Sequence, residues 1–110
     1  MAKFLITKRK NGEFQFSLKA SNGQEILASE GYTTKAACLN GVESVKKNAL
    51  SESSFEKKDA KNGKPYFVLK AANKQVIGTS EMYESAASRD NGIASVMKNA
   101  PSADIEEQLG

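Results

Sequence analysis

Apolar residues recur at every second position in two stretches of the chain, and this alternation predicts half-buried β-strands. Phe14, Phe16 and Leu18 are separated by polar residues, and Phe67 and Leu69 repeat the spacing later in the chain. Shorter apolar segments lie before and after this strand in the first half, around residues 4–6 and 26–28, and after it in the second half, around residues 77–79. The pattern predicts a three-stranded meander in each half of the chain.

The apolar spacing then changes to every third or fourth residue, which predicts one amphipathic helix after each meander. The helices are expected over residues 34–48 and 85–99, with Thr34 and Ser85 as N-caps. The apolar stripe consists of Cys38, Val42, Val45 and Ala49 in the first helix and of Ile93, Val96 and Ala100 in the second.

Both halves are copies of one unit. When the chain is shifted by 51 positions, residues 4–49 align with 55–100, and 22 of the 46 pairs are identical. A unit of this size buries too little apolar surface to be stable alone. We therefore expect a single domain, 1–110, of two interdependent repeats, about 3–52 and about 53–107. Its class is α+β: two β-β-β-α(-β) units form one antiparallel-rich sheet, with two helices on one face and a pseudo-twofold axis between the units.

Two details of the strands are also expected. Asn11-Gly12 and Asn62-Gly63 predict type I′ hairpins, whereas Asn73-Lys74 predicts a changed or strained turn. A short strand after each helix, over residues 55–59 and 104–107, is expected to pair with the opposite unit. Because residues 55–59 are more polar than residues 4–8, the opening strand of the second repeat is expected at an edge or in a crossover.

Gly41 and Gly92 lie in the middle of the predicted helices, where glycine costs about 1 kcal/mol relative to alanine. The favoured interpretation is that each glycine lets the helix backbone approach the sheet or the other helix closely. A break between two short helices and direct contact with a ligand are the alternatives.

Composition limits the possible functions. The 110 residues are 39% hydrophobic and 26% charged, with a formal net charge of +3, which is typical of a soluble domain. No apolar run approaches the ~18 residues of a membrane span, and the N-terminal residues do not resemble a secretory signal, so a cytoplasmic protein is expected. With one cysteine, Cys38, and no histidine, no disulfide, metal site or cofactor is expected. We interpret Cys38 as a small core residue.

Three sequence blocks occur twice: LKAxN at 18–22 and 69–73, SExY at 29–32 and 80–83, and NGxxSV at 40–45 and 91–96. In these blocks the chain resembles the YegP-like family of small bacterial proteins, over about residues 4–100. The resemblance implies two β-β-β-α-β units in a single sheet with exchanged terminal strands, and dimers for single-unit relatives. For this chain it agrees with a monomer that acts as an internal pseudo-dimer. The family has no assigned activity, so the resemblance supplies no catalytic residues.

Polar residues retained in both repeats are the first candidates for a site. They are Ser29 and Ser80, Glu30 and Glu81, Tyr32 and Tyr83, and Asn40 and Asn91. Structural roles are favoured for most of them: hydrogen bonds at strand ends for the serine-glutamate pairs, and packing over the first helical turn for the tyrosines. A small-molecule enzyme that uses Glu30 and Tyr32, or Glu81 and Tyr83, is the least favoured hypothesis, because no residue spacing indicates a catalytic site.

Basic residues around the first hairpin of each repeat are the second candidates. They are Lys8, Arg9, Lys10, Lys57, Lys58, Lys61 and Lys64, with Tyr66 as a possible stacking side chain. If the pseudo-twofold axis brought them to one edge, they could bind phosphate groups. A solvated charged face is favoured because the net charge is modest.

The sequence therefore favours a non-enzymatic binding or interaction module with an unknown ligand. The alternative is weak nucleic-acid binding through the hairpin lysines. An apolar partner site would instead require an exposed patch on the free face of the sheet, where Tyr66 and Val68 project.

Overall fold

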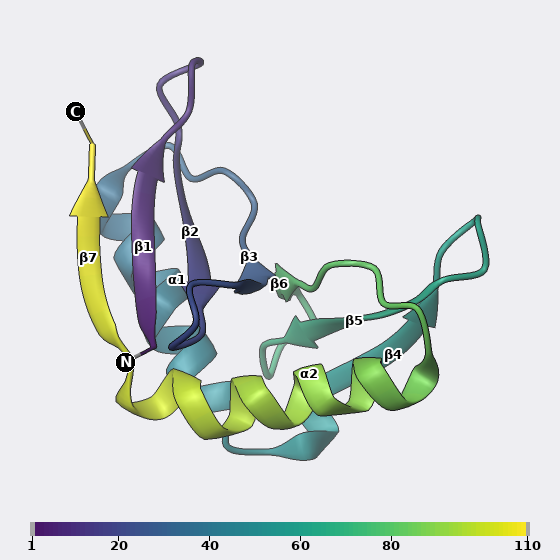
Figure 1. Ribbon diagram of the computed structural model, residues 1–110. Helices are drawn as coiled ribbons and strands as arrows, with labels where there is room; N and C mark the ends of the chain where they lie inside the picture. Colours follow the sequence, from purple (N-terminus) through teal and green to yellow (C-terminus); the bar gives the residue numbers. More distant parts are fainter. Residues whose placement is uncertain (1, 110) are drawn as a thin grey trace.

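The computed structural model describes residues 2–109 and contains the repeated elements in the expected order (Figure 1). The first repeat contains β1 (Lys3–Lys8), β2 (Phe14–Lys19), β3 (Glu25–Ala28) and α1 (Lys35–Asn48), followed by the short 3-10 helix η1 (Glu52–Ser54). The second repeat contains β4 (Phe55–Asp59), β5 (Pro65–Lys70), β6 (Val76–Thr79), α2 (Ala86–Asn99), the 3-10 helix η2 (Ala100–Ser102) and β7 (Asp104–Gln108).

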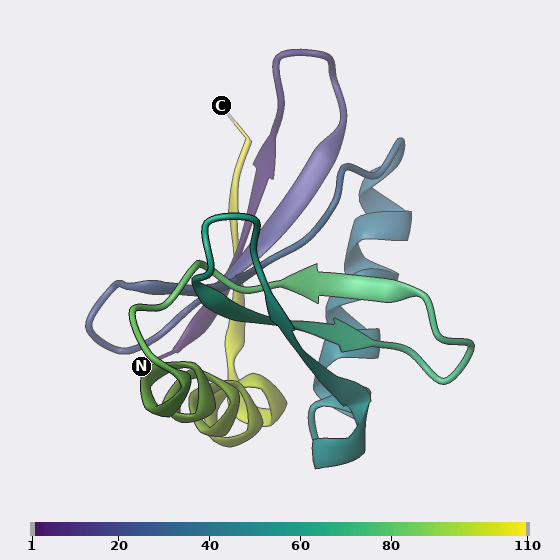
Figure 2. The same ribbon diagram turned by 90° about the vertical axis from the view of Figure 1, so that its right-hand side faces the viewer.

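The strands form one sheet with the order β4-β5-β6-β3-β2-β1-β7. Each meander is antiparallel, and the two meanders join edge to edge at β3 and β6, where Ala28 pairs with Thr79. Figure 2 shows the strands of the two halves crossing near this junction. The prediction of two β-β-β-α units in a single α+β sheet is confirmed.

Both helices pack against the same side of the sheet and share one core with it. Phe16 of β2, Phe67 of β5, Val45 of α1 and Val96 of α2 are completely buried in one continuous cluster. Helix α1 contacts β5 and β6 as well as β2, and α2 contacts β3 as well as β5. Each helix therefore covers strands of both repeats, and the apolar surface of either repeat is buried only when the other is present.

The hairpins differ from the expected type I′ turns, and that prediction was wrong. At the first hairpin the amide of Gly12 bonds the carbonyl of Arg9 at 3.0 Å, and only Gly12 has a left-handed backbone, with φ 87°. The side chain of Asn11 remains free to accept a hydrogen bond from the amide of Glu13 at 3.0 Å. Asparagine thus stabilises the turn through its side-chain oxygen rather than through a positive φ.

The same hydrogen-bond scheme recurs at the other three hairpins, including the one that lacks glycine. Lys74 occupies the left-handed position there, with φ 73°, and its amide bonds the carbonyl of Ala71 at 2.9 Å. The expected change of turn type does not occur. The other predicted outcome is confirmed, because Lys74 carries the backbone strain that a non-glycine residue has in this region.

Helices α1 and α2 are continuous through Gly41 and Gly92, so the predicted alternative of a helix break was wrong. The hydroxyls of Thr34 and Ser85 accept hydrogen bonds from the third residue after each at 3.1 Å, which confirms both N-caps. Of the helices described, neither has the length and apolarity needed to cross a lipid bilayer.

The strands that follow the two helices have different partners. Strand β7 crosses to the first repeat and pairs with β1 in parallel, with Phe4 opposite Ile105. Within residues 2–109, strand β4 pairs only with β5 of its own repeat. The expectation that both strands pair with the opposite unit is therefore confirmed for β7 and wrong for β4. The physical reason is that residues 55–59 also serve as the first strand of the second meander.

The two repeats meet through unequal residues. Leu27 of β3 is buried at the junction, and the equivalent residue of β6 is Gly78. A Cβ atom on Gly78 would lie 2.7 Å from both Cγ and Cδ2 of Leu27. The leucine of the first repeat thus fills the space that a side chain of the second repeat would need.

Candidate functional site

The retained serines have a structural role. The Ser29 hydroxyl accepts a hydrogen bond from the amide of Phe16 at 2.9 Å and donates one to the carbonyl of Glu30 at 2.8 Å. Ser80 makes the same two bonds with Phe67 and Glu81, at 3.0 and 2.8 Å. Both glutamates are exposed and contribute their backbone carbonyls to this arrangement. The predicted hydrogen bonding at strand ends is confirmed for both serines.

The retained tyrosines explain the mid-helix glycines. Tyr32 stacks on Phe16 with ring centroids 6.2 Å apart, and Tyr83 stacks on Phe67 at the same separation. A Cβ atom on Gly41 would lie 2.5 Å from the hydroxyl oxygen of Tyr32. Each helix therefore approaches the tyrosine and the sheet closely only because this position has no side chain, as the favoured interpretation predicted.

Burial gives these tyrosines little acid-base use at neutral pH. Desolvation raises the pKa of Tyr32 above its ordinary value of 10.0, and Cys38 and Glu30 nearby add to the effect. Desolvation and Glu81 likewise raise the pKa of Tyr83. Cys38 is completely buried, and burial raises the pKa of its thiol. The structure thus places Cys38 in the core, where sequence analysis put it.

The basic candidates do not gather in one place. The β1–β2 and β4–β5 hairpins project from different ends of the molecule (Figure 1). Several of their cations already have partners: Arg9 is 3.7 Å from Glu13, Lys58 is 2.9 Å from Glu56 and Lys64 is 3.0 Å from Glu84. Lys8 lies over the ring of Phe14, with its Nζ atom 5.6 Å from the ring centroid, and Lys10 and Lys61 are exposed.

Tyr66 and Val68 do not form the exposed apolar patch that an apolar partner site would require. Val68 is 4% exposed. Tyr66 is half-buried and lies opposite Lys58 in the β4–β5 register.

Each helix is separated from a turn of the other repeat by one groove. The larger one, about 440 Å³, lies between α1 and the β5–β6 turn. The smaller one, about 220 Å³, lies between α2 and the β2–β3 turn. Four pairs of equivalent residues line both grooves: Asn40 and Asn91, Ser44 and Ser95, Ala71 and Ala20, and Asn73 and Asn22. All four pairs are identical in the two repeats.

Of these four pairs, sequence analysis had singled out only Asn40 and Asn91 as candidate site residues. Ser44 and Ser95 could have been recognised, because each lies four residues after the retained asparagine on the same helix face. Their contact with the turn of the opposite repeat depends on how the halves cross, which spacing along the chain does not reveal.

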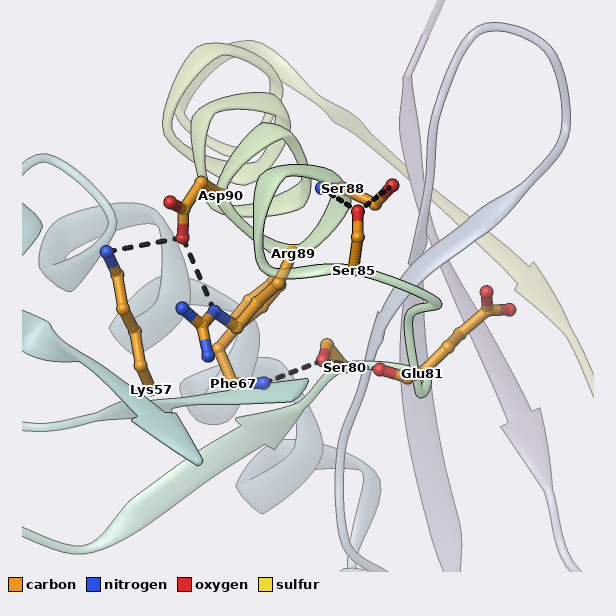
Figure 3. A network of polar contacts seen from close by, with 8 residues as sticks. All are labelled: Lys57, Phe67, Ser80, Glu81, Ser85, Ser88, Arg89 and Asp90. Carbon is orange, nitrogen blue, oxygen red and sulfur yellow. Dashed lines mark hydrogen bonds and ion pairs between the residues drawn. The ribbon is translucent and has the colours of Figure 1, made fainter. Parts of the chain in front are cut away.

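The second repeat also contains a charged cluster that the first repeat lacks (Figure 3). Lys57, Arg89 and Asp90 replace Ile6, Cys38 and Leu39. We call these three residues the charged seam, because they lie where β4 meets α2.

The charged seam is held together by ion pairs. The Lys57 Nζ atom is 3.2 Å from Asp90 Oδ1, and the Arg89 Nε atom is 3.3 Å from the same oxygen. The hydrogen bond from Lys57, with a further contribution from Arg89, lowers the pKa of the Asp90 carboxyl. The Arg89 side chain is 13% exposed and the Lys57 side chain is 51% exposed. The seam therefore presents two cations and one anion, partly open to solvent.

Within residues 2–109, no group of three or more His, Cys, Asp or Glu side chains lies close enough together to hold a metal ion.

Comparison with known sequences and structures identifies the family to which this chain belongs. The profile of a domain of unknown function (DUF1508) matches residues 10–56 and again residues 60–107. A UPF0339 protein of Shewanella oneidensis is 54% identical over 93% of both chains, and the UPF0339 protein YegP of Yersinia pestis is 54% identical over 93% of this chain and 91% of its own. The chain belongs to the UPF0339/YegP family.

Solved structures of the UPF0339/YegP family share the fold. The solution structure of YegP from Escherichia coli, a protein of unknown function, has a TM-score of 0.94 and 48% identity over 99% of this chain and 94% of its own. The Shewanella oneidensis UPF0339 structure has a TM-score of 0.93 and 51% identity over 98% and 92%. The family resemblance and the tandem repeat are confirmed, and the function of this UPF0339 protein is unknown.

Proposed function

We propose that this protein is a non-enzymatic binding module and that its two inter-repeat grooves hold neutral, hydrogen-bonding ligands. Amide and hydroxyl side chains predominate in the residues shared by both grooves. Such groups recognise a ligand by donating and accepting hydrogen bonds without requiring a charge.

The supporting observation is the exposed asparagine retained in each helix. Asparagine is less favourable in a helix than alanine, by up to about 0.7 kcal/mol. Asn40 and Asn91 are exposed, and within residues 2–109 their side chains take part in none of the hydrogen bonds found. By contrast, Asn48 donates to the carbonyl of Ser44 at 2.8 Å, so its retention has a structural reason. Asn40 and Asn91 have no such reason, and ligand binding supplies one.

A spectroscopic screen tests this proposal. Labelled protein is titrated with neutral sugars and small amides while the backbone amide signals are followed. Binding compounds are expected to shift the signals of residues 40–48 and 71–73, which line the larger groove. Asn40→Ala should weaken binding about tenfold and raise the melting temperature by up to a few degrees, since alanine has the higher helix propensity.

Lys10→Ala, on the distant β1–β2 hairpin, is the matched control and should bind normally. Shifts that avoid both grooves for every compound would contradict the proposal. Chemical conversion of a bound compound would contradict its non-enzymatic part. Salt-sensitive shifts at the two basic hairpins on addition of an oligonucleotide would favour the nucleic-acid alternative instead.

A further inference from the structure

The outer edge of β1 shows how this fold accepts a parallel strand. Strand β7 pairs along β1 with Ile105 opposite Phe4 and Glu107 opposite Ile6. Glu107 also forms an ion pair of 2.6 Å with Lys35 of α1. An apolar residue followed two positions later by an acid thus reaches the helix side of the sheet.

The equivalent edge in the second repeat is open. Strand β4 is the last strand of the described sheet and has a hydrogen-bonded neighbour on one side only, so its outer backbone groups are available for pairing. Phe4 is completely buried, whereas its counterpart Phe55 is only half-buried. The residue opposite Phe4 at the occupied edge is Ile105, whereas in the described part of the chain no strand lies opposite Phe55 on its outer side.

The charged seam lies along this open edge. At the occupied edge Glu107 stands opposite Ile6, and the counterpart of Ile6 at the open edge is Lys57. An acidic side chain in the same register would therefore meet Lys57, with Arg89 on the adjoining helix (Figure 3). Asp90 satisfies only part of the hydrogen-bonding capacity of the two cations, since an ammonium has three donors and a guanidinium five.

We propose that the open edge of β4 captures an acidic, extended segment of a partner protein as an eighth, parallel strand. The segment places an apolar side chain on Phe55 and, two residues later, a carboxylate beside Lys57 and Arg89. Phe55 and the residues of the charged seam line neither groove, so the proposal stands or falls independently of the function proposed above.

Charge and geometry favour another protein over a second copy of this chain. The acidic strand of a second copy, β7, is already held on its own β1, where Glu106 and Glu107 form ion pairs with Lys3 and Lys35. Pairing between β4 of one copy and β7 of the next would use the two opposite edges of the sheet. Such a head-to-tail contact is heterologous, so it would produce rings or open chains of molecules rather than a closed symmetric pair.

A synthetic peptide with the sequence ADIEEQL, residues 103–109, is the first probe, because this fold already accepts that sequence as a parallel strand. Its ends are blocked, and it is titrated into labelled full-length protein. The amide signals of residues 55–59, 89 and 90 are expected to shift with saturation. A peptide with lysine in place of the second glutamate should bind at least tenfold more weakly.

The matched variant is Lys57→Ile, which introduces the residue that the first repeat has at this position. It should keep the spectrum of the folded protein, bind ADIEEQL several-fold more weakly, and bind ADIELQL at least as well as the parent protein does. This reciprocal change would not arise from general damage to the fold.

Other results would overturn the proposal. Absence of saturable shifts at millimolar peptide would do so, as would equal binding of the acidic and lysine-containing peptides, or shifts along β1 that report displacement of β7. Shifts of the same β4 signals on concentrating the protein alone, with a rise in molecular mass, would assign the edge to a second copy rather than to a partner protein.

Discussion

The first strand of each repeat meets its helix in a different way. In the first repeat the corresponding residues are Ile6 and Cys38, which belong to the buried core, and Leu39, which packs against it, and β7 covers the edge. In the second repeat the equivalent residues are the charged seam, and the edge is open. The first repeat forms the same β-β-β-α unit with apolar residues at these positions, so we expect that the charges are not needed to form it. Two copies of one unit thus have a closed apolar contact in one case and a charged contact beside an open edge in the other.

The largest loss of stability is expected when the junction between β3 and β6 is given the same residue in both repeats. Gly78→Leu would place a side chain into the space of Leu27 and should lower the free energy of unfolding by at least about 3 kcal/mol. The exchanged pair Leu27→Gly with Gly78→Leu keeps one leucine at the junction and should recover at least half of this loss. Chemical denaturation of the two proteins measures both effects, and a double variant no more stable than Gly78→Leu would contradict the account.

The next largest effect should be equal in the two repeats. Gly41→Ala and Gly92→Ala each gain helix propensity but force a methyl group against a tyrosine ring. The steric cost should prevail, and each variant should lose about 1–3 kcal/mol of unfolding free energy. Ala94→Gly, an exposed position of α2, is the control for propensity alone. Thermal melting that showed a stabilised Gly41→Ala protein would refute the close-approach explanation.

A smaller effect should follow from giving the second repeat the residues of the first. The triple change Lys57→Ile, Arg89→Cys and Asp90→Leu replaces a partly buried ion cluster with apolar side chains. The free energy of unfolding should stay the same or rise by about 1 kcal/mol, because the ions lose hydration that their pairing only partly offsets. Denaturant titration measures this change, and a loss of more than about 2 kcal/mol would show that the charges support the fold.

Substitutions at the left-handed turn position should change the free energy of unfolding by a smaller amount, with opposite signs in the two repeats. Lys74→Gly should stabilise the protein by about 0.5–1 kcal/mol, since glycine adopts the left-handed φ of this position without strain. Gly23→Lys, at the equivalent turn of the first repeat, should destabilise it by a similar amount. Both changes are measured by denaturation, and the same sign in both repeats would contradict the interpretation.

The smallest effect is confined to one carboxyl group. Hydrogen bonds from Lys70 and Lys58 lower the pKa of Glu56 from 4.5 to about 2, whereas the equivalent residue of the first repeat, Leu5, does not titrate. The stabilising contribution of the Glu56 carboxylate is thus complete above pH 4.5 and is lost as the pH falls towards 2. Carboxyl carbon NMR should detect this low midpoint, and Lys70→Met should raise it. An ordinary midpoint in the parent protein would contradict the pairing.

The duplication made most of the fold predictable. Alternation around Phe16 and Phe67, the helix caps Thr34 and Ser85, and the aligned glycines identified the elements and their single sheet. The partners of β4 and β7 were less predictable, because residues 55–59 end one unit and begin the next. The turn type was missed because asparagine can stabilise a turn through its side chain or through its own φ, and the dipeptide is the same in either case.

The candidate surfaces were harder to predict than the fold. Lys57 was noticed as one of several hairpin cations, but the other two residues of the charged seam, Arg89 and Asp90, lie some thirty residues further along the chain. Only the register of β4 and the position of α2 show that these charges adjoin a vacant edge. Comparing the repeats position by position would have revealed the three apolar-to-charged replacements, although not what they face.

The unequal residues at Leu27 and Gly78 also bear on synthesis in the cell. The N-terminal repeat leaves the ribosome first, at a time when neighbouring ribosomes on the same message display the same half-finished chain. If two such unfinished chains paired through their β3 strands, Leu27 of one chain would lie against Leu27 of the other. This clash disfavours pairing between unfinished chains, so the β3 edge of each chain remains free to pair with β6 of its own second repeat.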